Sequence, residues 1–526
     1  MSDANNLPSH QKNTAPAIEV YAVYGADPEI QAYAMAKYSR SALSMKESLR
    51  EINEQRAEKF LNTFYFQYGH RSIADLAHLA IAVEKLSILA AIALVDEQRW
   101  DGQERSTRYQ DFKRGGYFTP DFSRLEMCEL RYRDTVAMLM AEYEALSETT
   151  WRYLADKTPK PPEMKPEAYE RTLRARAFDI SRYLLPLATN TSLGQIVNAR
   201  TLETQISRLL SHTHPEVRHL GELLKQAAKE PAYNVNEVRY RQLIEDAKGY
   251  DEAWGKQLRD DILKPVRVAP TLVKYAEANP YEMETRRELK QAAAEIMAEA
   301  PIAPAPLVDL LEDEPLEIEL ATTLLYEHCH HSYRQVRERV EGMGAKRRDE
   351  IIHLGLKHRG RHDELLRPFH AGQSFRFDIL MDIGGFRDMH RHRRCTQIGQ
   401  AFTTVHGFDM PEEVRAAGVE KRYAETMKRA AEAAQHVEAE LRRAGCDHAE
   451  ASALYLIPLG YRKRTLFKMD FAEAVYVAEL RTGPGGHISY RRVAYQMYEA
   501  VASRHPALAH YFRVTDIKQE VDLLQR

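Results

Sequence analysis

Hydrophobic and polar residues alternate along residues 374–383, Ser-Phe-Arg-Phe-Asp-Ile-Leu-Met-Asp-Ile, and this period of two predicts a β-strand. Gly384 and Gly385 interrupt the pattern, and a segment rich in arginine and histidine follows at residues 386–400. A second apolar stretch, at residues 76–95, lies in the first half of the chain. Both apolar stretches lead directly into charged segments.

The rest of the pattern is mostly helical. A helix begins near residues 26–29, where Asp27 is a candidate cap and Pro28 fits the first turn. Apolar periodicity predicts further helices over residues 121–155 and 214–229. The predicted elements are therefore mainly helices.

A chain of 526 residues is too long for one ordinary hydrophobic core, and two domains of roughly 200 residues each are expected. Prolines punctuate residues 230–305 on either side of a charged helix, which marks a divider. The predicted organisation is a disordered tail at 1–16, an N-terminal domain at 17–245, a helical linker at 246–305 and a C-terminal domain at 306–526.

Composition argues against several classes of protein. A net charge of −3 and a pI of about 6.7 disfavour a general nucleic-acid binder, which is usually basic. No apolar run reaches the roughly 20 residues of a membrane span. The run His-Cys-His-His at residues 328–331 lacks a clear distant ligand pair, which disfavours a zinc protein. Four scattered cysteines indicate a reducing compartment, so we expect a cytoplasmic protein with a small-molecule partner and neither nucleic acid nor membrane.

The basic segment is centred on Arg391-His392-Arg393. A guanidinium binds phosphate bidentately and stacks on rings, and an imidazole faces a heterocycle as donor or acceptor. The alternatives are a solvated basic helix face and a metal site at His390 and His392, whose i,i+2 spacing puts them on opposite sides of a helix. Cys395 is a candidate low-pKa thiol, although a small packing residue is favoured.

A second polar segment places Glu104, Ser106 and Arg108 at i, i+2 and i+4, which is one face of an extended loop. Together they supply an acceptor, a hydroxyl and a forked donor. Those groups suit a phosphorylated sugar. A polar surface turn is the alternative interpretation.

The second half repeats the first at low similarity. In the first half Pro186 precedes Asn198 by 198 − 186 = 12 residues. In the second half Pro458 precedes Asp470 by 470 − 458 = 12 residues. An apolar pair stands before each proline, and an apolar helix follows each polar residue, so internal duplication is the favoured interpretation.

Each half is similar to one domain of the flavin-dependent thymidylate synthase (ThyX) family, and the resemblance covers most of the chain outside the tail and the divider. The family's motifs are divided between the halves. The first half keeps Gly69-His70-Arg71-Ser72, Glu104-x-Ser106-x-Arg108-Tyr109, Arg182-x-x-x-Pro186 and Asn198-x-Arg200. The second half keeps Arg391-His392-Arg393 and, at the position of the family's last arginine (470 + 11 = 481), Arg481.

Each half lacks what the other keeps. In place of Arg-His-Arg and the last arginine, the first half has Asp96-Glu97-Gln98 and Leu209, with Arg208 adjacent. In place of the motif Glu, Ser, Arg, Arg and Asn, the second half has Gly399, Ala401, Thr403, Leu454 and Asp470. The family is a homotetramer whose pockets are built by several subunits, so a fused duplicate that keeps one composite pocket accounts for the complementary losses. Asp388 departs from the glutamine that the family usually has.

The resemblance implies an α+β fold of two tandem, diverged ThyX-like domains, helix-rich and each with a mixed β-sheet. It implies reductive methylation of dUMP to dTMP, with FAD as cofactor, NADPH and methylenetetrahydrofolate as co-substrates, and a homodimer that mimics the tetramer. The alternatives are an inactive flavin- or nucleotide-binding relative, or related flavin chemistry on another pyrimidine nucleotide.

By position in the motifs, the resemblance also assigns roles to residues, and no metal is expected. The catalytic residue is Arg481. The substrate-binding residues are Glu104, Ser106, Arg108, Arg182 and Arg391. The cofactor-binding residues are His70, Ser72, Asn198, Arg200, Arg391, His392 and Arg393.

Overall fold

The first half of the chain forms a small sheet surrounded by helices. The computed structural model describes residues 27–37, 71–113, 115–122, 125–312, 314–360, 366–371, 375–506, 509, 512–519, 522 and 524. The first-half elements are α1 Pro28–Lys37, η2 Arg71–Leu76, β1 His78–Ser87, α4 Ile88–Val95, β2 Asp101–Glu104, α5 Glu126–Lys157, α6 Pro166–Ser181, η3 Arg182–Leu184, β3 Asn190–Asn198, α7 Ala199–Leu210 and α8 Pro215–Lys229. Helices α1, α5 and α8 confirm the three helices predicted in this half, while the tail predicted at 1–16 lies outside the described residues.

Two strands of the first half pass directly into helices because each ends on a capping residue. The Ser87 side chain accepts a hydrogen bond from the Ala90 amide at 2.9 Å and starts α4. The Asn198 side chain accepts from the Thr201 amide at 2.8 Å and starts α7. A polar cap satisfies one of the amides that a helix leaves free at its beginning.

The second half repeats this arrangement and adds to it. Its elements are β4 Val308–Leu310, α12 Leu316–Tyr326, α13 Tyr333–Glu341, α14 Ala345–Leu354, η4 Arg367–Phe369, β5 Phe375–Asp382, α15 Ile383–Met389, β6 Thr396–Gly399, α16 Glu412–Ala416, α17 Glu420–Arg443, α18 Ala449–Ala453, η5 Leu454–Leu456, β7 Arg462–Met469, α19 Phe471–Thr482 and α20 Ile488–Arg504. Strand β5 confirms the strand predicted from the alternating pattern. The caps recur as well, with Asp382 starting α15 and Asp470 starting α19.

Both sheets have the same strand order. It is β1-β3-β2 in the first half and β5-β7-β6 in the second, where β4 adds an edge strand. A mixed sheet was expected in each half, but every described strand pair is antiparallel, because the outer strands both run against the central one. The halves are therefore diverged copies of one helix-rich α+β fold.

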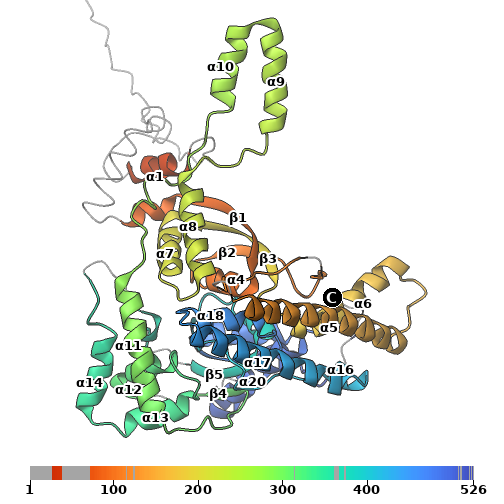
Figure 1. Cartoon of the computed structure of the whole chain (residues 1–526), viewed down its shortest axis with the longest axis vertical. Coiled ribbons are helices and arrows are strands. Elements are labelled where there is room, and N and C mark those ends of the chain that lie inside the picture. Colours follow the sequence, from red (N-terminus) through yellow and green to blue (C-terminus); the bar gives the residue numbers. More distant parts are fainter. Residues whose placement is uncertain are drawn as a thin grey trace, which may run out of the picture.

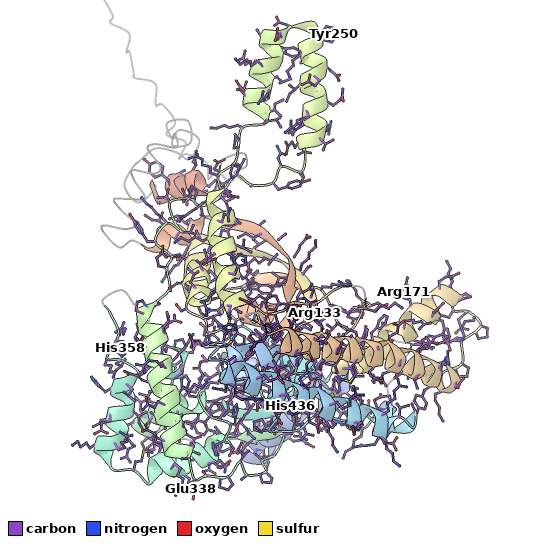
Figure 2. All side chains as sticks on the ribbon, viewed as in Figure 1. Arg133, Arg171, Tyr250, Glu338, His358 and His436 are labelled. Atoms are coloured by element: carbon purple, nitrogen blue, oxygen red, sulfur yellow. The ribbon has the colours of Figure 1, made fainter. Side chains whose placement is uncertain are left out.

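Three helices occupy the divider between the halves: α9 Glu237–Tyr250, α10 Glu252–Ile262 and α11 Pro280–Met297. Helices α9 and α10 form a hairpin that extends away from the body of the molecule, with Tyr250 at its end (Figures 1 and 2). Helix α11 packs with α12 and α14 of the second half.

The halves meet through backbone hydrogen bonds around Pro186 and Pro458, which form an antiparallel bridge. The bonds occur in reciprocal pairs, each 2.9 Å long: Leu187 N to Ile457 O with Leu459 N to Leu185 O, and Ala188 N to Tyr455 O with Gly460 N to Tyr183 O. Reciprocal bonds are the pattern of an interface between two identical surfaces. The junction thus keeps the two-fold relation of the duplicated halves.

Side chains of both halves form one continuous core around this junction. Leu187 and Leu459 are completely buried in the same cluster of apolar residues. Helix α5 lies along α17 (Figure 1), and Arg131 of α5 forms an ion pair with Glu440 of α17 at 3.2 Å. Within the described part of the chain, no helix has both the length and the apolar character to cross a membrane.

Gly460 tests how tightly the junction is packed. A Cβ at this position would lie 2.8 Å from the Tyr423 hydroxyl and 3.1 Å from Met427 Cε. Because Tyr423 is buried and its hydroxyl donates to the Asp409 carbonyl, it cannot move freely. We expect Gly460→Ala to lower the free energy of unfolding by about 1–3 kcal/mol, measured by denaturant titration.

Gly344→Ala is the matched control. Gly344 has a φ of −63°, and a Cβ added there would have nothing within 4 Å, so its substitution meets no steric obstacle. Because Gly344 is the N-cap of α14, where alanine is less favourable than glycine, the free energy of unfolding should fall by less than about 1 kcal/mol. Equal losses in the two variants would contradict a close-packed junction.

Candidate active site

A pocket lies between the halves and is lined by residues of both. The first half contributes Ser106, Thr107, Arg108 and Arg182, and the second contributes Arg387, Asp388 and Arg391. The first three directly follow β2, and the last three lie on or just after α15. The predicted substrate residues Ser106, Arg108, Arg182 and Arg391 are therefore brought together within one chain.

Arg108 is buried and links the halves. Its Nε donates to Asp179 Oδ1 at 3.0 Å in the first half. Its Nη1 donates to the Tyr490 hydroxyl at 2.9 Å, and its Nη2 donates to the Gly485 carbonyl at 3.0 Å, both in the second half. The alternative of a polar surface turn is wrong for this residue.

Arg182 lies deeper and is held between two carboxylates. Its Nη1 donates to Asp388 Oδ2 at 3.3 Å, and its Nε lies 3.4 Å from Asp179 Oδ1. Burial by itself raises the pKa of Asp179. The positive charges of His487, Arg182 and Arg108 together outweigh this effect and lower the pKa to about 2. Arg182 Nη2 is buried without a hydrogen-bond partner among the described residues and remains available to an anion.

Glu104 takes part in the site through an ion pair with Arg387, whose Nη1 also lies 3.4 Å from Thr107 Oγ1. Arg391 is exposed and makes no hydrogen bond or ion pair with any described residue. Burial raises the pKa of Asp388, but Arg182, Arg108 and Arg391 together lower it below the ordinary value. An ionised carboxylate therefore lies among the arginines of the pocket.

A second pocket adjoins the rest of the basic segment. Its lining residues are Asp96, Glu97, Gln98, Arg367, His390, His392, Arg393, Cys395 and Gln397. The segment that replaces Arg-His-Arg in the first half thus lies beside Arg-His-Arg itself. The guanidinium carbon of Arg393 lies 4.7 Å from the ring centroid of Trp100, and Arg367 forms an ion pair with Asp96. Burial lowers the pKa of His390 to about 4, so this ring is neutral at physiological pH.

His392 and Arg481 form a defined pair at the edge of this pocket. Arg481 Nε donates to His392 Nε2 at 2.7 Å, and His392 Nδ1 lies 3.5 Å from Glu473 Oε1. Because Nε2 accepts, the proton of the neutral ring is on Nδ1 and faces the carboxylate. Burial lowers the pKa of His392, which favours this neutral form.

Burial decides between the interpretations of the basic segment. Arg387, His390 and His392 are at most 9% exposed, so a solvated basic face is wrong for them. Among the described residues, no group of three or more His, Cys, Asp or Glu side chains could hold a metal ion. Burial raises the pKa of the Cys395 thiol to about 12, which identifies it as a packing residue and not a reactive thiolate.

Some predicted cofactor residues lie elsewhere. Neither Asn198 nor Arg200 lines either pocket. Asn198 is the cap of α7, and Arg200 Nη1 donates to Asp75 Oδ2 at 3.3 Å. His70 lies outside the described residues, and the side chain of Ser72 is not described.

The positions equivalent to the site in the other half carry different chemistry. Where His392 meets Arg481 in the second half, Glu97 accepts from Arg208 Nε at 2.8 Å in the first, and Leu209 is buried. Where the first half has Glu104, the second has Gly399, and a Cβ there would lie 3.0 Å from Lys463 Nζ. A buried lysine thus fills the space.

The structure defines a duplicated α+β protein with a cation-lined pocket shared by its two copies. A family model described as thymidylate synthase complementing protein matches residues 21–232 and 306–507. The chain belongs to this family and carries its domain twice, in tandem.

Relatives of two lengths match the chain. The UPF0159 protein of Chlamydia pneumoniae is 27% identical over 96% of this chain and 93% of its own length. The flavin-dependent thymidylate synthase of Clostridium tetani is 23% identical over 40% of this chain and 82% of its own length. A crystal structure of flavin-dependent thymidylate synthase ThyX from Helicobacter pylori, complexed with FAD and dUMP, covers 38% of this chain and 89% of that chain at 15% identity and a TM-score of 0.24.

The cap of α15 makes stability depend on pH. Burial raises the pKa of Asp382 from 3.8 to about 7, and the Asp409 carboxylate adds to the rise. The folded state therefore binds an extra proton between these values, and its stability decreases as pH rises through them. Asparagine keeps the cap but does not titrate. Between roughly pH 5.5 and pH 8, the free energy of unfolding should therefore fall by about 2 kcal/mol more in the wild type than in Asp382→Asn, measured by chemical denaturation.

Asp470→Asn is the matched control, because Asp470 caps α19 as Asp382 caps α15. A backbone hydrogen bond from Glu473 lowers the pKa of Asp470, so its titration lies below this window. A pH profile that is equal in the wild type and in Asp382→Asn would contradict a protonated buried cap.

Proposed function

We propose that the chain is a flavin-dependent thymidylate synthase whose nucleotide site is composite, with one side from each half. The reaction is the reductive methylation of dUMP to dTMP. The observation that carries this proposal is the pocket in which Ser106, Arg108 and Arg182 of the first half face Arg391 of the second. Membership of the thymidylate synthase complementing protein family supports the class of reaction.

In this proposal the pocket arginines hold the phosphate of dUMP. Arg391 is exposed and Arg182 has a buried nitrogen without a partner among the described residues, so both have donors to offer. Ser106 and Arg108 contact the sugar phosphate, and Glu104 accepts from the nucleotide or orients Arg387. Arg481 is the catalytic residue that polarises a pyrimidine carbonyl, since a fixed cation stabilises the charge that develops as C5 becomes nucleophilic.

FAD fits the donors of the second pocket. Arg393 Nε and His390 Nε2 are buried there without hydrogen-bond partners among the described residues, although Asp96 Oδ1 lies 3.6 Å from His390 Nε2. Both nitrogens suit an anionic or heterocyclic group. His392 and Arg393 would hold the cofactor together with Arg391, and His70, Ser72, Asn198 and Arg200 would contact its more distant parts. Bound FAD supplies the hydride chemistry, with NADPH as reductant and methylenetetrahydrofolate as one-carbon donor.

Two further parts of the proposal concern assembly and compartment. The residues assigned to FAD are spread beyond one pocket, which supports a homodimer that completes the cofactor site. The scattered cysteines support a reducing compartment, and we propose a cytoplasmic enzyme.

A second candidate function is related flavin chemistry on another pyrimidine nucleotide, and Asp388 favours it. The carboxylate lies 3.3 Å from Arg182 Nη1 and competes with a phosphate for the same donor. A third candidate is a binding protein without turnover. The two alternatives differ in whether the flavin is reduced and reoxidised in the presence of the nucleotide.

Tritium release from C5-labelled dUMP tests the proposal, with FAD, NADPH and methylenetetrahydrofolate present. We expect release by the wild type, and a loss of about a hundredfold or more in Arg481→Ala and in the Ser106→Ala/Arg108→Gln double variant. Arg171→Ala, an exposed position on α6 away from the pocket, is the control and should retain full activity (Figure 2).

Folded, flavin-loaded wild type that releases no tritium would overturn the synthase proposal. Flavin reoxidation by another pyrimidine nucleotide in that sample would then support the changed substrate, and binding without reoxidation would support the binding protein.

A further inference from the structure

We propose that Tyr490 is a positioning residue that fixes the separation of Arg108 and Arg481, and that the site therefore selects ligands long enough to contact both arginines. The inference rests on the proposed function, in which Arg108 holds the sugar phosphate and Arg481 faces the pyrimidine. Tyr490 belongs to none of the sequence motifs.

The Tyr490 ring lies beside both Arg108 and Arg481. The guanidinium carbons of Arg108 and Arg481 each lie 5.5 Å from the centroid of the Tyr490 ring. The Tyr490 hydroxyl accepts from Arg108 Nη1 at 2.9 Å. Burial raises the pKa of Tyr490, so the phenol keeps its proton and presents a neutral oxygen.

The ring itself has little freedom to move. Tyr490 is 3% exposed, and a Cβ at Gly486 would lie 2.7 Å from its Cε2, so the ring packs directly on the backbone of the preceding turn. The neighbouring Ser489 hydroxyl donates to Asp382, the residue that caps α15. The first turn of α20 is thereby joined to the helix that carries Arg387 and Asp388.

A fixed aromatic ring solves an electrostatic problem in this site. Two guanidinium groups that are brought close in a poorly solvated region repel each other. The face of the ring attracts both cations, and its hydroxyl oxygen accepts from Arg108, so the ring can hold the two arginines at a defined spacing. A carboxylate there would compete with the phosphate of the nucleotide.

The contacts form a chain that joins the two pockets. It runs from His392 through Arg481, Tyr490 and Arg108 to Asp179, which also contacts Arg182. In this series of contacts, Tyr490 connects the pair His392 and Arg481 to Arg108. Its removal should uncouple the two arginines without removing either of them.

Equilibrium binding of three probes to the full chain tests the inference: dUMP, which reaches both arginines, and deoxyuridine and inorganic phosphate, which each reach one. We expect Tyr490→Leu to weaken dUMP binding at least about tenfold, while binding of each smaller probe changes by less than about threefold. Tyr490→Phe keeps the ring and should give a smaller loss. Tyr495→Phe on the same helix is the control and should bind all three probes as the wild type does.

The ratio of dUMP affinity to the affinities of the two smaller probes separates positioning from a general loss of structure. A misfolded variant loses all three ligands and has a lower melting temperature. Tyr490→Phe is expected to keep the melting temperature of the wild type. If the wild type binds dUMP and the ratio is unchanged in both Tyr490 variants, the inference is wrong and the proposed function stands. If the wild type binds none of the probes, the proposed function fails and the inference fails with it.

Discussion

The reciprocal hydrogen bonds around Pro186 and Pro458 are the constraint on which the site depends. Tyr183 O accepts from Gly460 N in this junction, and Arg182 is the residue immediately before Tyr183. On the other side, Leu459 O accepts from Gly384 N at 3.0 Å, which anchors the start of α15 to the same crossing. The deepest arginine of the first half and the helix bearing Asp388 are therefore positioned by one short stretch of backbone.

A symmetric scaffold here carries asymmetric chemistry. Both halves pass from a strand through a polar cap into a short buried helix, and both return through the central strand of a sheet. The side chains at the ends of those elements differ. In one half Glu97 and Arg208 form an ion pair, whereas in the other a neutral His392 accepts from Arg481. Backbone hydrogen bonds do not depend on these side chains, so the fold tolerated their divergence.

The sequence was informative where local pattern determines structure. The strand at Phe375–Asp382, the helices near residues 28, 126 and 215, and the tandem duplication all follow from periodicity and spacing, and the structure confirms them. The resemblance to the ThyX family also predicted that residues of both halves belong together, and four of the five predicted substrate residues line one pocket.

Burial and long-range partners were not predictable in this way. Asp179 of α6 and Tyr490 of α20 both lie far from Arg108 in the sequence, and Tyr490 contacts it only because the halves pack against each other. Nothing in the local sequence distinguishes them from other acidic or aromatic helix residues. Asn198 is a motif residue that also serves in the structure as a helix cap, a role that the motif did not predict.

The central claim is that a single chain supplies both sides of the nucleotide pocket, and mixing of differently substituted chains tests it most directly. One chain carries Arg108→Gln in the first half, and the other carries Arg391→Glu in the second. Each variant alone, shown to be folded by its melting curve, should bind dUMP weakly. A pocket built within one chain predicts that co-expressed, co-purified mixtures bind no better than either variant alone. Recovery of tight binding in the mixture would mean that the two sides come from different chains, and would contradict the account.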